Sequence, residues 1–337
     1  MSATTAKGIS ERTQKLLRDA LVWDDHGCMP LRPNDTSFLP QLSRYHDAGT
    51  DVVSLNVGFD VVPWENTVRM LASFRHWVRQ HADRYILIET IADVRRAKAE
   101  HKLGVTFDIE GGCSLTEQLS MVELYHDLGV RWMLIAYNRN NALGGGCQDE
   151  DTGLTAFGRQ VVDEMRRVGM VLCCTHTGHR TTMDVMEYTR NPVIFSHSNP
   201  TAVRKHRRNI GDDVIKACAS TGGVIHINGI GDFLGKNDAR SETMVRHIDY
   251  VVNLVGARHV GLGFDYVFDQ AELDEFLKKN PQSFPPEDGY GSGTMNIARP
   301  EQMPEITEGL VKLGYKDADI VGILGGNHLR VAEQVWK

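Results

Sequence analysis

Short runs of apolar and β-branched residues recur eight times along this 337-residue chain, and stretches with helical periodicity separate most of them. Several runs are apolar at successive positions, as expected for strands that are buried on both faces of a parallel sheet. The predicted strands span residues 21–25, 51–57, 103–110, 131–138, 169–176, 192–197, 222–228 and 259–266. This alternation predicts an α/β protein with a parallel sheet.

The segments between the strands carry apolar residues at three- and four-residue spacing, which is typical of amphipathic helices. Such helices are predicted over 116–129, 155–169 and 241–257. Gly129 and Gly169 end two of them and suit a helix C-terminal cap that is followed by a short loop to the next strand.

Eight strand–helix units favour a closed (β/α)8 barrel, also called a TIM barrel. A doubly wound open sheet is the alternative, although no glycine-rich phosphate-binding fingerprint follows the first strand. We find no linker or break in composition and expect one domain over residues 1–337, with an N-terminal helix at 10–20. The longest insertion, residues 268–300 after the eighth strand, predicts a loop over the active face that could serve as a lid.

The charge and composition of the chain argue against several classes of function. The net charge of −7 offers no basic face for nucleic acid and argues against binding to an anionic membrane surface. No stretch approaches the roughly 18 apolar residues of a membrane span, and the N-terminus lacks the apolar core of a secretion signal. Six scattered cysteines are too few for a disulfide framework. We therefore expect a cytoplasmic protein that acts on a small molecule.

In a barrel, the carboxyl ends of all strands point to one mouth. Here those ends carry Asp24, Asp25, His26, Glu110, Tyr137, Asn138, His176, His197, Asn228 and Asp265. Taken singly, such a histidine is often a hydrogen-bonded structural residue, and such a carboxylate often caps a helix. Together they predict a divalent metal site, because acidic groups gathered in one buried place repel one another without a cation between them.

Six separated motifs resemble, in the same order, those of the renal or membrane dipeptidases. They are TFDIEGG (106–112), THTGHRT (175–181), PVIFSHSNP (192–200), RRNIGDD (207–213), VGLGFDY (260–266) and GGNHLRV (325–331). The resemblance runs from about residue 20 to the C-terminus. It implies a (β/α)8-barrel metallohydrolase with a binuclear zinc site that acts on dipeptides, and the family suggests a homodimer.

Matched motif by motif, the resemblance assigns metal ligands to this sequence. It implies that His26 binds the first metal, that Glu110 bridges both metals, and that His176 and His197 bind the second metal. These residue types agree with the imidazole and carboxylate ligands that zinc prefers.

Two further matches concern the substrate. The resemblance implies that Arg208 holds the substrate carboxylate, which suits a guanidinium because it grips a carboxylate in a bidentate fork. From the residues alone, Arg208 is better explained as a solvated member of the basic run 204–209. The resemblance implies that Asp265 handles the proton and the substrate amine.

The chain departs from the family pattern at two positions. Cys28 stands where the family has an aspartate ligand of the first metal, so either a thiolate replaces that ligand or the first metal is weak or absent. Asp24 or Asp25 could orient His26 in either case. Tyr137 stands where the family commonly has a histidine, and its phenol either donates to a developing oxyanion or only packs.

The resemblance thus implies a metal-dependent hydrolase that cleaves the amide bond of dipeptides by attack of a metal-bound hydroxide. It implies one or two zinc ions per chain, with Glu110, Asp265 and Tyr137 in catalysis and Arg208, Tyr137 and Asp265 in contact with the substrate.

Other functions remain open at this point. One is an amidohydrolase that acts on a small non-peptide or modified amino-acid amide. Another is a catalytically impaired barrel that binds a metabolite, in which Cys28 and Tyr137 mark lost chemistry. A thiol enzyme with Cys28 as nucleophile and His26 as base is the weakest hypothesis, because it leaves the other strand-end ligands unexplained.

Overall fold

The computed structural model describes residues 8–290 and 293–337 of the chain. The described strands join one sheet, and every strand pair in it is parallel. The order is β10-β1-β2-β4-β5-β6-β7-β8-β9, and β3 lies beside β4. The strands are β1 (Trp23–Cys28), β2 (Val52–Phe59), β3 (Tyr85–Leu87), β4 (Leu103–Glu110), β5 (Val130–Leu134), β6 (Val171–Cys173), β7 (Val193–Phe195), β8 (Val224–Asn228), β9 (Val260–Gly263) and β10 (Tyr266–Val267).

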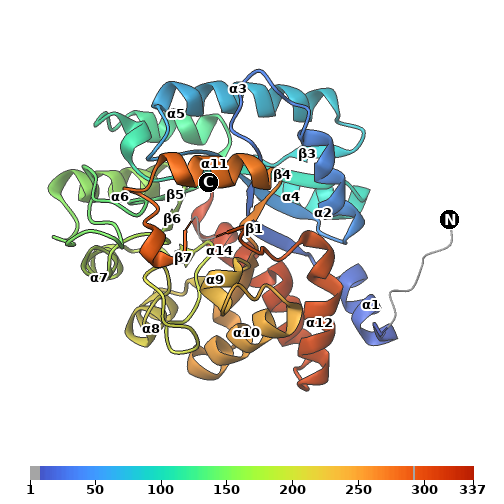
Figure 1. Ribbon diagram of the computed structural model, residues 1–337. Coiled ribbons are helices and arrows are strands. Elements are labelled where there is room, and N and C mark those ends of the chain that lie inside the picture. Colours follow the sequence, from blue (N-terminus) through green and yellow to red (C-terminus); the bar gives the residue numbers. More distant parts are fainter. Residues whose placement is uncertain (1–7, 291–292) are drawn as a thin grey trace.

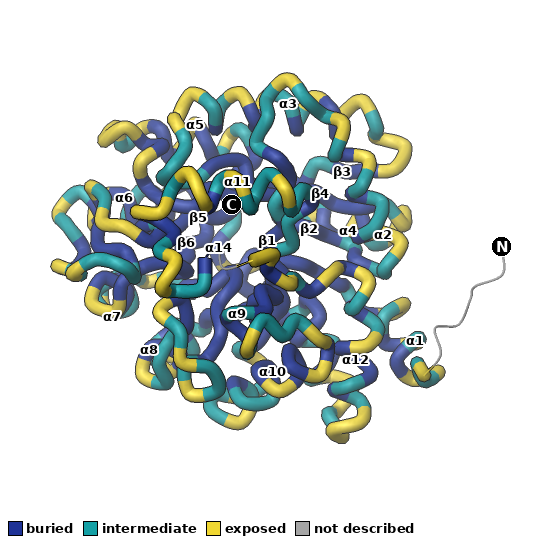
Figure 2. The backbone as a smooth tube through the Cα atoms, in the orientation of Figure 1, coloured by how far each residue is buried: buried dark blue, intermediate teal, exposed yellow. Residues whose placement is uncertain are grey.

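Helices follow most strands and form an outer ring around them, as Figure 1 shows. They are α1 (Glu11–Asp19), α2 (Ser43–Asp47), α3 (Trp64–Gln80), α4 (Ile91–Glu100), α5 (Met121–Asp127), α6 (Ala156–Val168), α7 (His179–Tyr188), α8 (Asp212–Ser220), α9 (Gly231–Leu234), α10 (Ser241–Val255), α11 (Gln270–Lys279), α12 (Met303–Lys312), α13 (Asp317–Val321) and α14 (Asn327–Val335). The strands are buried and the outer faces of the helices are exposed (Figure 2). The predicted alternation of strands and helices is confirmed.

The sheet closes into a barrel where the chain leaves β9. Asp265 has a left-handed backbone, with φ of 57°, and its N–H donates to the carbonyl of His26 on β1 at 3.0 Å. The N–H of Phe264 donates to Oδ1 of Asp24 at 2.9 Å. β10 then continues beside β1 as its parallel neighbour. The chain after the last long strand is therefore joined to the first strand, and the predicted (β/α)8 barrel is confirmed.

The structure differs from the sequence prediction in local detail. The helix predicted over 116–129 begins only at Met121, because Thr116 and Glu117 adopt left-handed backbone angles, with φ of 50° and 55°. Strand β3 was not predicted, since a three-residue strand between two helices has too little pattern to be recognised. The predicted helix at 10–20 is present as α1.

Helix α14 closes the amino-terminal end of the barrel. Its Val331 and Val335 pack against the first residues of the strands, including Trp132 on β5 and Val171 on β6. Asn327 Nδ2 donates to two carbonyls before and at the start of β9, at 2.7 and 2.8 Å. The strand starts on which α14 packs are therefore mainly apolar, and the opposite end of the barrel holds most of the polar strand ends.

The segment 268–300, predicted as a loop over the active face, contains helix α11 and crosses the mouth of the barrel (Figure 1). Its residues 291–292 lie outside the described part of the chain. Apolar side chains of this segment cluster with two residues after β8: Leu277, Phe284, Tyr290 and Met295 with Ile230 and Phe233. The segment thus covers the mouth, and its movement as a lid stays a prediction.

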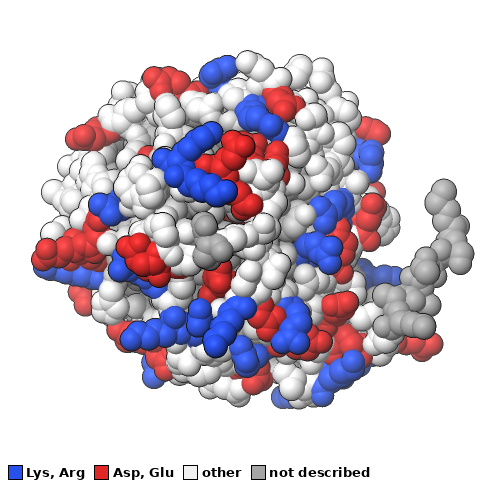
Figure 3. Space-filling model, in the orientation of Figure 1, with Lys and Arg blue, Asp and Glu red and all other residues white. Residues whose placement is uncertain are grey.

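Lys and Arg side chains are interspersed with Asp and Glu over the face of the molecule that Figure 3 shows. Among the described residues, no helix combines the length and the apolar character that crossing a bilayer requires. The expectation that nucleic acid and membranes are not partners stays a prediction.

The substitution Gly263→Ala tests the packing of the barrel interior. A Cβ at this position on β9 would lie 1.9 Å from the carbonyl oxygen of Ser196, a backbone atom that cannot rotate away. We expect the free energy of unfolding to fall by about 1–3 kcal/mol, as overpacked cores generally show. Urea denaturation measures this loss. The control Gly235→Ala places its Cβ 3.3 Å from a flexible side chain, that of Asp238, and should cost less; equal costs would contradict the argument.

Candidate metal centre

One carboxylate oxygen lies at the centre of the polar strand ends. Glu110 Oε1, at the end of β4, is 3.7 Å from Nε2 of His26, 3.4 Å from Nε2 of His176 and 3.2 Å from Nε2 of His197. Nε2 of His176 and Nε2 of His197 are 3.0 Å apart. Four predicted ligands that are far apart in sequence therefore meet within a few ångströms.

The residues present fit a divalent cation at this point. Glu110 Oε1 is buried and accepts no hydrogen bond from any described residue, and three ring nitrogens face it. Burial lowers the pKa of His176 and of His197 well below the usual value, so both rings stay neutral, which is the form that binds metals. Burial raises the pKa of Glu110 to about 8, because its charge has too little compensation without a cation.

The two histidines that follow β6 and β7 are held with Nε2 toward Glu110. His176 Nδ1 donates to Oδ1 of Asn138 at 2.7 Å, and His197 Nδ1 lies 2.9 Å from Oγ of Ser196. Hydrogen bonds of this kind orient a ligand ring and fix which nitrogen faces the metal. Asn138 and His176 both have left-handed backbones, with φ of 60° and 62°. Such strained conformations concentrate at functional sites.

Cys28 and Asp265 form the other half of the centre with His26. Cys28 Sγ is 3.4 Å from His26 Nε2 and 3.5 Å from Oδ1 of Asp265, and that same oxygen is 3.6 Å from His26 Nε2. Burial raises the pKa of the Cys28 thiol to about 12, so it keeps its proton unless a cation displaces it. The predicted thiol is therefore placed to contact a metal, and its role as a ligand is a proposal.

The expectation that Asp24 or Asp25 orients the His26 ring is wrong. Asp108 Oδ1 lies 3.4 Å from His26 Nδ1, whereas Asp24 contacts only the backbone N–H of His26, at 3.4 Å. Asp25 faces the interior of the barrel. The pairing of β1 with β2 shifts register between Asp24 and Gly27, and this irregularity changes which side chains face the mouth.

Asp108 and Asn56 are site residues that the sequence prediction missed. Asn56 Nδ2 is 3.1 Å from Oδ1 of Asp108 and 3.3 Å from Oε2 of Glu110, so it helps to hold both carboxylates. Asp108 lies two residues before Glu110 on β4, and alternation along a strand places both on one face. The two-residue spacing from Glu110 was the sequence signal that could have identified Asp108. For Asn56, the only signal was its position near the end of a predicted strand.

Arg208 lies beside the centre in a buried position. Its Nη2 donates to His176 Nε2 at 2.9 Å, and its Nε has no hydrogen-bond partner among the described residues. The ring centroid of Phe233 is 5.4 Å from the guanidinium carbon. Arg208 is thus not a solvated member of the basic run, the explanation that the residues alone had favoured; its exposed neighbour Arg207 is such a residue.

Comparison with known proteins identifies the family. The family model of the membrane dipeptidases, peptidase family M19, matches residues 48–277, more than half of the chain. This chain belongs to the membrane dipeptidase family. The matched residues include Glu110, Tyr137, His176, His197, Arg208 and Asp265, whereas the predicted site residues of the first strand precede them.

Individual members of the family are moderately similar in sequence. An uncharacterized dipeptidase from Schizosaccharomyces pombe is 29% identical over 247 residues, which are 70% of this chain and 53% of that protein. Dipeptidase aclJ from Aspergillus oryzae is 28% identical over 287 residues, 83% of this chain and 63% of that protein. The chain therefore spans less than two thirds of the length of these curated relatives.

Solved structures support the fold. An amidohydrolase from Pseudomonas aeruginosa has a TM-score of 0.87 at 26% identity, with 96% of this chain and 99% of that chain covered. A metallopeptidase from Rhodobacter sphaeroides that is liganded with a phosphinate mimic of the dipeptide L-Ala-D-Ala has a TM-score of 0.75 at 19% identity, with 94% and 100% covered. At this lower identity, the likeness shows the barrel alone.

In this member of the dipeptidase family, Tyr137 lies beside the candidate metal centre. Its ring stacks on that of His176, with centroids 3.9 Å apart and planes inclined by 24°. Burial raises the pKa of the Tyr137 phenol well above the usual value, so the hydroxyl keeps its proton at neutral pH. Tyr137 lines a cavity of about 250 Å³ together with the predicted ligands Cys28, Glu110 and His176, and the other walls are mainly apolar.

We expect the affinity for Zn²⁺ to rise with pH. Without a cation, Glu110 and Cys28 keep their protons below pKa values of about 8 and about 12, and a cation binds the deprotonated forms. Each released proton raises the affinity ~10-fold per pH unit below the pKa of its group. Competition with a chromophoric chelator between about pH 6 and 7.5 measures the slope. Cys28→Ala should lower the slope by about one proton, and a pH-independent affinity would contradict the assignment.

Proposed function

We propose that the protein is a metal-dependent hydrolase that cleaves the amide bond of dipeptides. The observation that carries the proposal is the buried Glu110 Oε1, which lies within 3.7 Å of three histidine ring nitrogens and has no hydrogen-bond partner among the described residues. Membership of the membrane dipeptidase family supports it.

We assign two sets of ligands around Glu110. His26 and Cys28 would hold a first metal ion with Glu110, and His176 and His197 would hold a second. Imidazole, thiolate and carboxylate together suit zinc better than harder cations, which prefer oxygen ligands alone. When bound, such ions polarise a carbonyl group and make a water molecule more acidic.

Asp265 is placed to handle the proton. Asn228 Nδ2 donates to its Oδ2 at 2.9 Å, which fixes the carboxylate and leaves Oδ1 toward His26 and Cys28. An oxygen held in this way can accept a proton from the attacking water and return it to the leaving amine. Tyr137, which keeps its proton, can donate a hydrogen bond to the oxyanion that develops on the substrate carbonyl.

Arg208 is placed to bind the free carboxylate of the substrate. In the structure its guanidinium donates to the His176 lone pair that a metal ion would need. A cation on His176 would displace that hydrogen bond and would leave a buried guanidinium that forms no ion pair with any described carboxylate. A substrate carboxylate can supply the missing negative charge in a bidentate pair.

The cavity walls indicate how the rest of the substrate is held. The metal ligands and Arg208 lie at one side of the cavity, and aromatic and aliphatic side chains surround the other: Phe59, Ile230, Phe233, Phe276, Phe284 and Tyr290. An apolar wall favours substrates with apolar side chains and keeps bulk water from the reacting groups.

An amidohydrolase that acts on a modified amino acid is the second candidate. The Pseudomonas aeruginosa amidohydrolase, which matches nearly the whole chain, favours it. Such a substrate would use the same carboxylate site and metal centre. A panel of L,L and L,D dipeptides and N-acyl amino acids, assayed with added zinc, separates the two candidates.

Each cysteine is free in the structure, which supports our proposal that the protein works in a reducing compartment such as the cytoplasm. The single domain over residues 1–337 and the homodimer stay predictions.

Replacing His197 by alanine tests the metal centre. We expect His197→Ala to lose metal and to lower kcat/KM by more than about 100-fold, since even groups that only orient a metal ligand contribute ~10–100-fold. The measurements are metal content per chain and dipeptide hydrolysis, with circular dichroism to check folding. His247→Ala, which removes a buried histidine that does not line the cavity, is the control. Unchanged metal content and activity in His197→Ala would refute the assignment.

Replacing Arg208 by alanine tests carboxylate recognition. Removing one partner of a buried charge pair costs ~2–5 kcal/mol, so we expect kcat/KM on substrates with a free carboxylate to fall by at least about 30-fold. Substrates amidated at that carboxylate should be affected much less. The neighbouring exposed Arg207→Ala should leave both rates within about 2-fold, because surface ion pairs contribute little. Equal losses on both substrate types would exclude this role for Arg208.

A further inference from the structure

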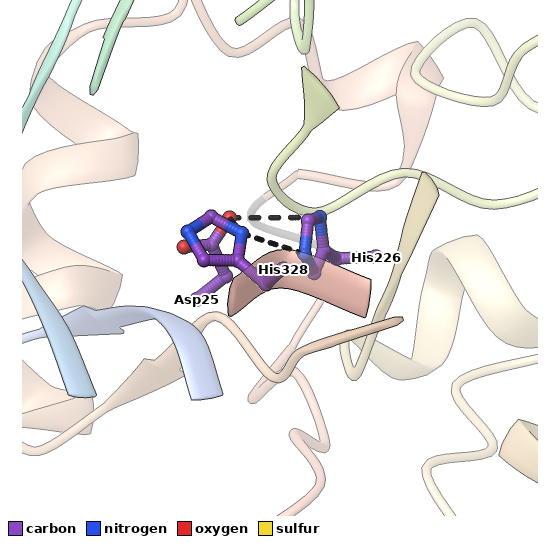
Figure 4. Close-up of side chains that lie close together, drawn as sticks. All are labelled: Asp25, His226 and His328. Atoms are coloured by element: carbon purple, nitrogen blue, oxygen red, sulfur yellow. Dashed lines mark hydrogen bonds and ion pairs between the residues drawn. The ribbon is translucent and has the colours of Figure 1, made fainter. Parts of the chain in front are cut away.

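A second cluster of potential metal ligands lies inside the barrel, below the centre at the mouth. It consists of Asp25 on β1, His226 on β8 and His328 in the first turn of α14, and Figure 4 shows the three side chains turned toward one another. All three are buried. The proposed reaction uses none of them.

The distances within this cluster match those between the ligands of one small cation. Asp25 Oδ2 is 3.4 Å from His328 Nδ1, and His328 Nδ1 is 3.1 Å from His226 Nε2, the nitrogen of that ring that does not face the Phe195 carbonyl. Four ligands placed tetrahedrally around zinc at its usual bond lengths lie roughly 3.4 Å apart. One ligand atom from each side chain lies within 4.8 Å of the others.

Asp25 lacks a partner that would explain its burial. The residue is fully buried, and neither of its carboxylate oxygens has a hydrogen-bond partner among the described residues. The nearby indole N–H of Trp132 lowers the pKa of Asp25 in part, but its hydrogen bond within normal geometry goes to Ser54 Oγ at 3.1 Å. An ionised carboxylate without a compensating cation is costly to bury, so burial raises the pKa of Asp25 well above its usual value, and its Oδ2 faces both histidines.

His226 is held in the orientation and tautomer of a metal ligand. Its Nδ1 donates to the carbonyl of Phe195 at 2.8 Å, which leaves the lone pair on Nε2 toward His328. A backbone carbonyl commonly holds a metal-binding histidine in this way. Gly261 on the neighbouring strand provides the room, because a Cβ there would lie 2.3 Å from the His226 ring.

Hydrogen bonds within the cluster do not satisfy all three residues. A proton on His328 Nδ1 can be donated to His226 Nε2, and the chain of donors then ends at the Phe195 carbonyl. That arrangement uses the N–H donors of both rings, so neither ring donates a hydrogen bond to Asp25. A cation between the three side chains would satisfy the carboxylate and both ring nitrogens at once.

We propose that Asp25, His226 and His328 form a further metal site, which binds a zinc-like divalent cation between the barrel interior and helix α14. Two imidazoles and one carboxylate are a common zinc ligand set, and a water molecule would complete four-coordination. The ion would join strand β1, strand β8 and the C-terminal helix α14. None of the three side chains lines the cavity at the mouth and all are buried, which assigns the ion a structural role.

Crystals of the full-length protein grown with excess zinc chloride test the proposal directly. An anomalous difference map recorded above and below the zinc edge should show a peak between Asp25, His226 and His328. A map with peaks at Glu110 and none at this cluster would overturn the inference, as would a map without any zinc peak. A peak at the cluster with none at Glu110 would support the inference and refute the proposed function.

Metal content in solution supplies an independent measurement. We expect the variants His226→Gln and His328→Gln to contain about one zinc ion per chain less than the unaltered protein after dialysis, and to melt at lower temperature. His247→Gln is the matched control, because His247 is equally buried and donates to a backbone carbonyl, that of Leu234, at 2.8 Å. It should retain the full metal content.

Three outcomes of these variants decide the question. Loss of one ion from both cluster variants but not from the control supports the site. Unchanged metal content in a folded His328→Gln protein overturns it. If the variants do not fold, the anomalous map of the unaltered protein decides. His197→Ala should keep the cluster's ion while it loses the ion at the mouth, which separates the two sites.

Discussion

A buried carboxylate surrounded by histidine rings is the constraint on which the rest of the site depends. Glu110 lies at the end of a central strand, and three ring nitrogens lie within 3.7 Å of one of its oxygens. Burial penalises the ionised carboxylate, and two of the rings are kept neutral by the same burial. A divalent cation offsets both effects, because it stabilises the anionic carboxylate and uses the lone pairs of neutral rings.

Barrel closure makes this arrangement possible. The proposed ligands come from β1, from β4 and from the turns after β6 and β7, and they converge only because the sheet curves into a ring. The backbone of Asp265 contributes to closure through its hydrogen bond to His26, and its side chain faces the same centre. The residue proposed to move the proton thus also holds the ring together, which explains its left-handed backbone.

The interior of this barrel contains two layers of buried polar residues. Above lies the centre around Glu110, and below it lies the cluster of Asp25, His226 and His328, beneath which the helix α14 packs on apolar strand starts. Adjacent residues on β1 serve the two layers, since His26 faces the mouth and Asp25 faces the interior. Buried polar groups at both levels need compensation, and a cation at each level would provide it.

Local patterns in the sequence were sufficient to predict the strand–helix alternation, the parallel barrel and the placement of His26, Glu110, His176 and His197 at one mouth. These features follow from hydrophobic periodicity and from the common direction of parallel strands, and both can be recognised within short stretches. The motif resemblance added the family and the roles of individual residues.

Only the tertiary structure decided which neighbours these residues have. Asp108 rather than Asp24 or Asp25 lies against His26, because an irregular register in β1 changes the facing of its side chains. His328 meets Asp25 although nearly the whole chain separates them in sequence. Such contacts depend on strand register, on the curvature of the sheet and on the helix that closes it, and these are set by packing between distant segments rather than by local pattern.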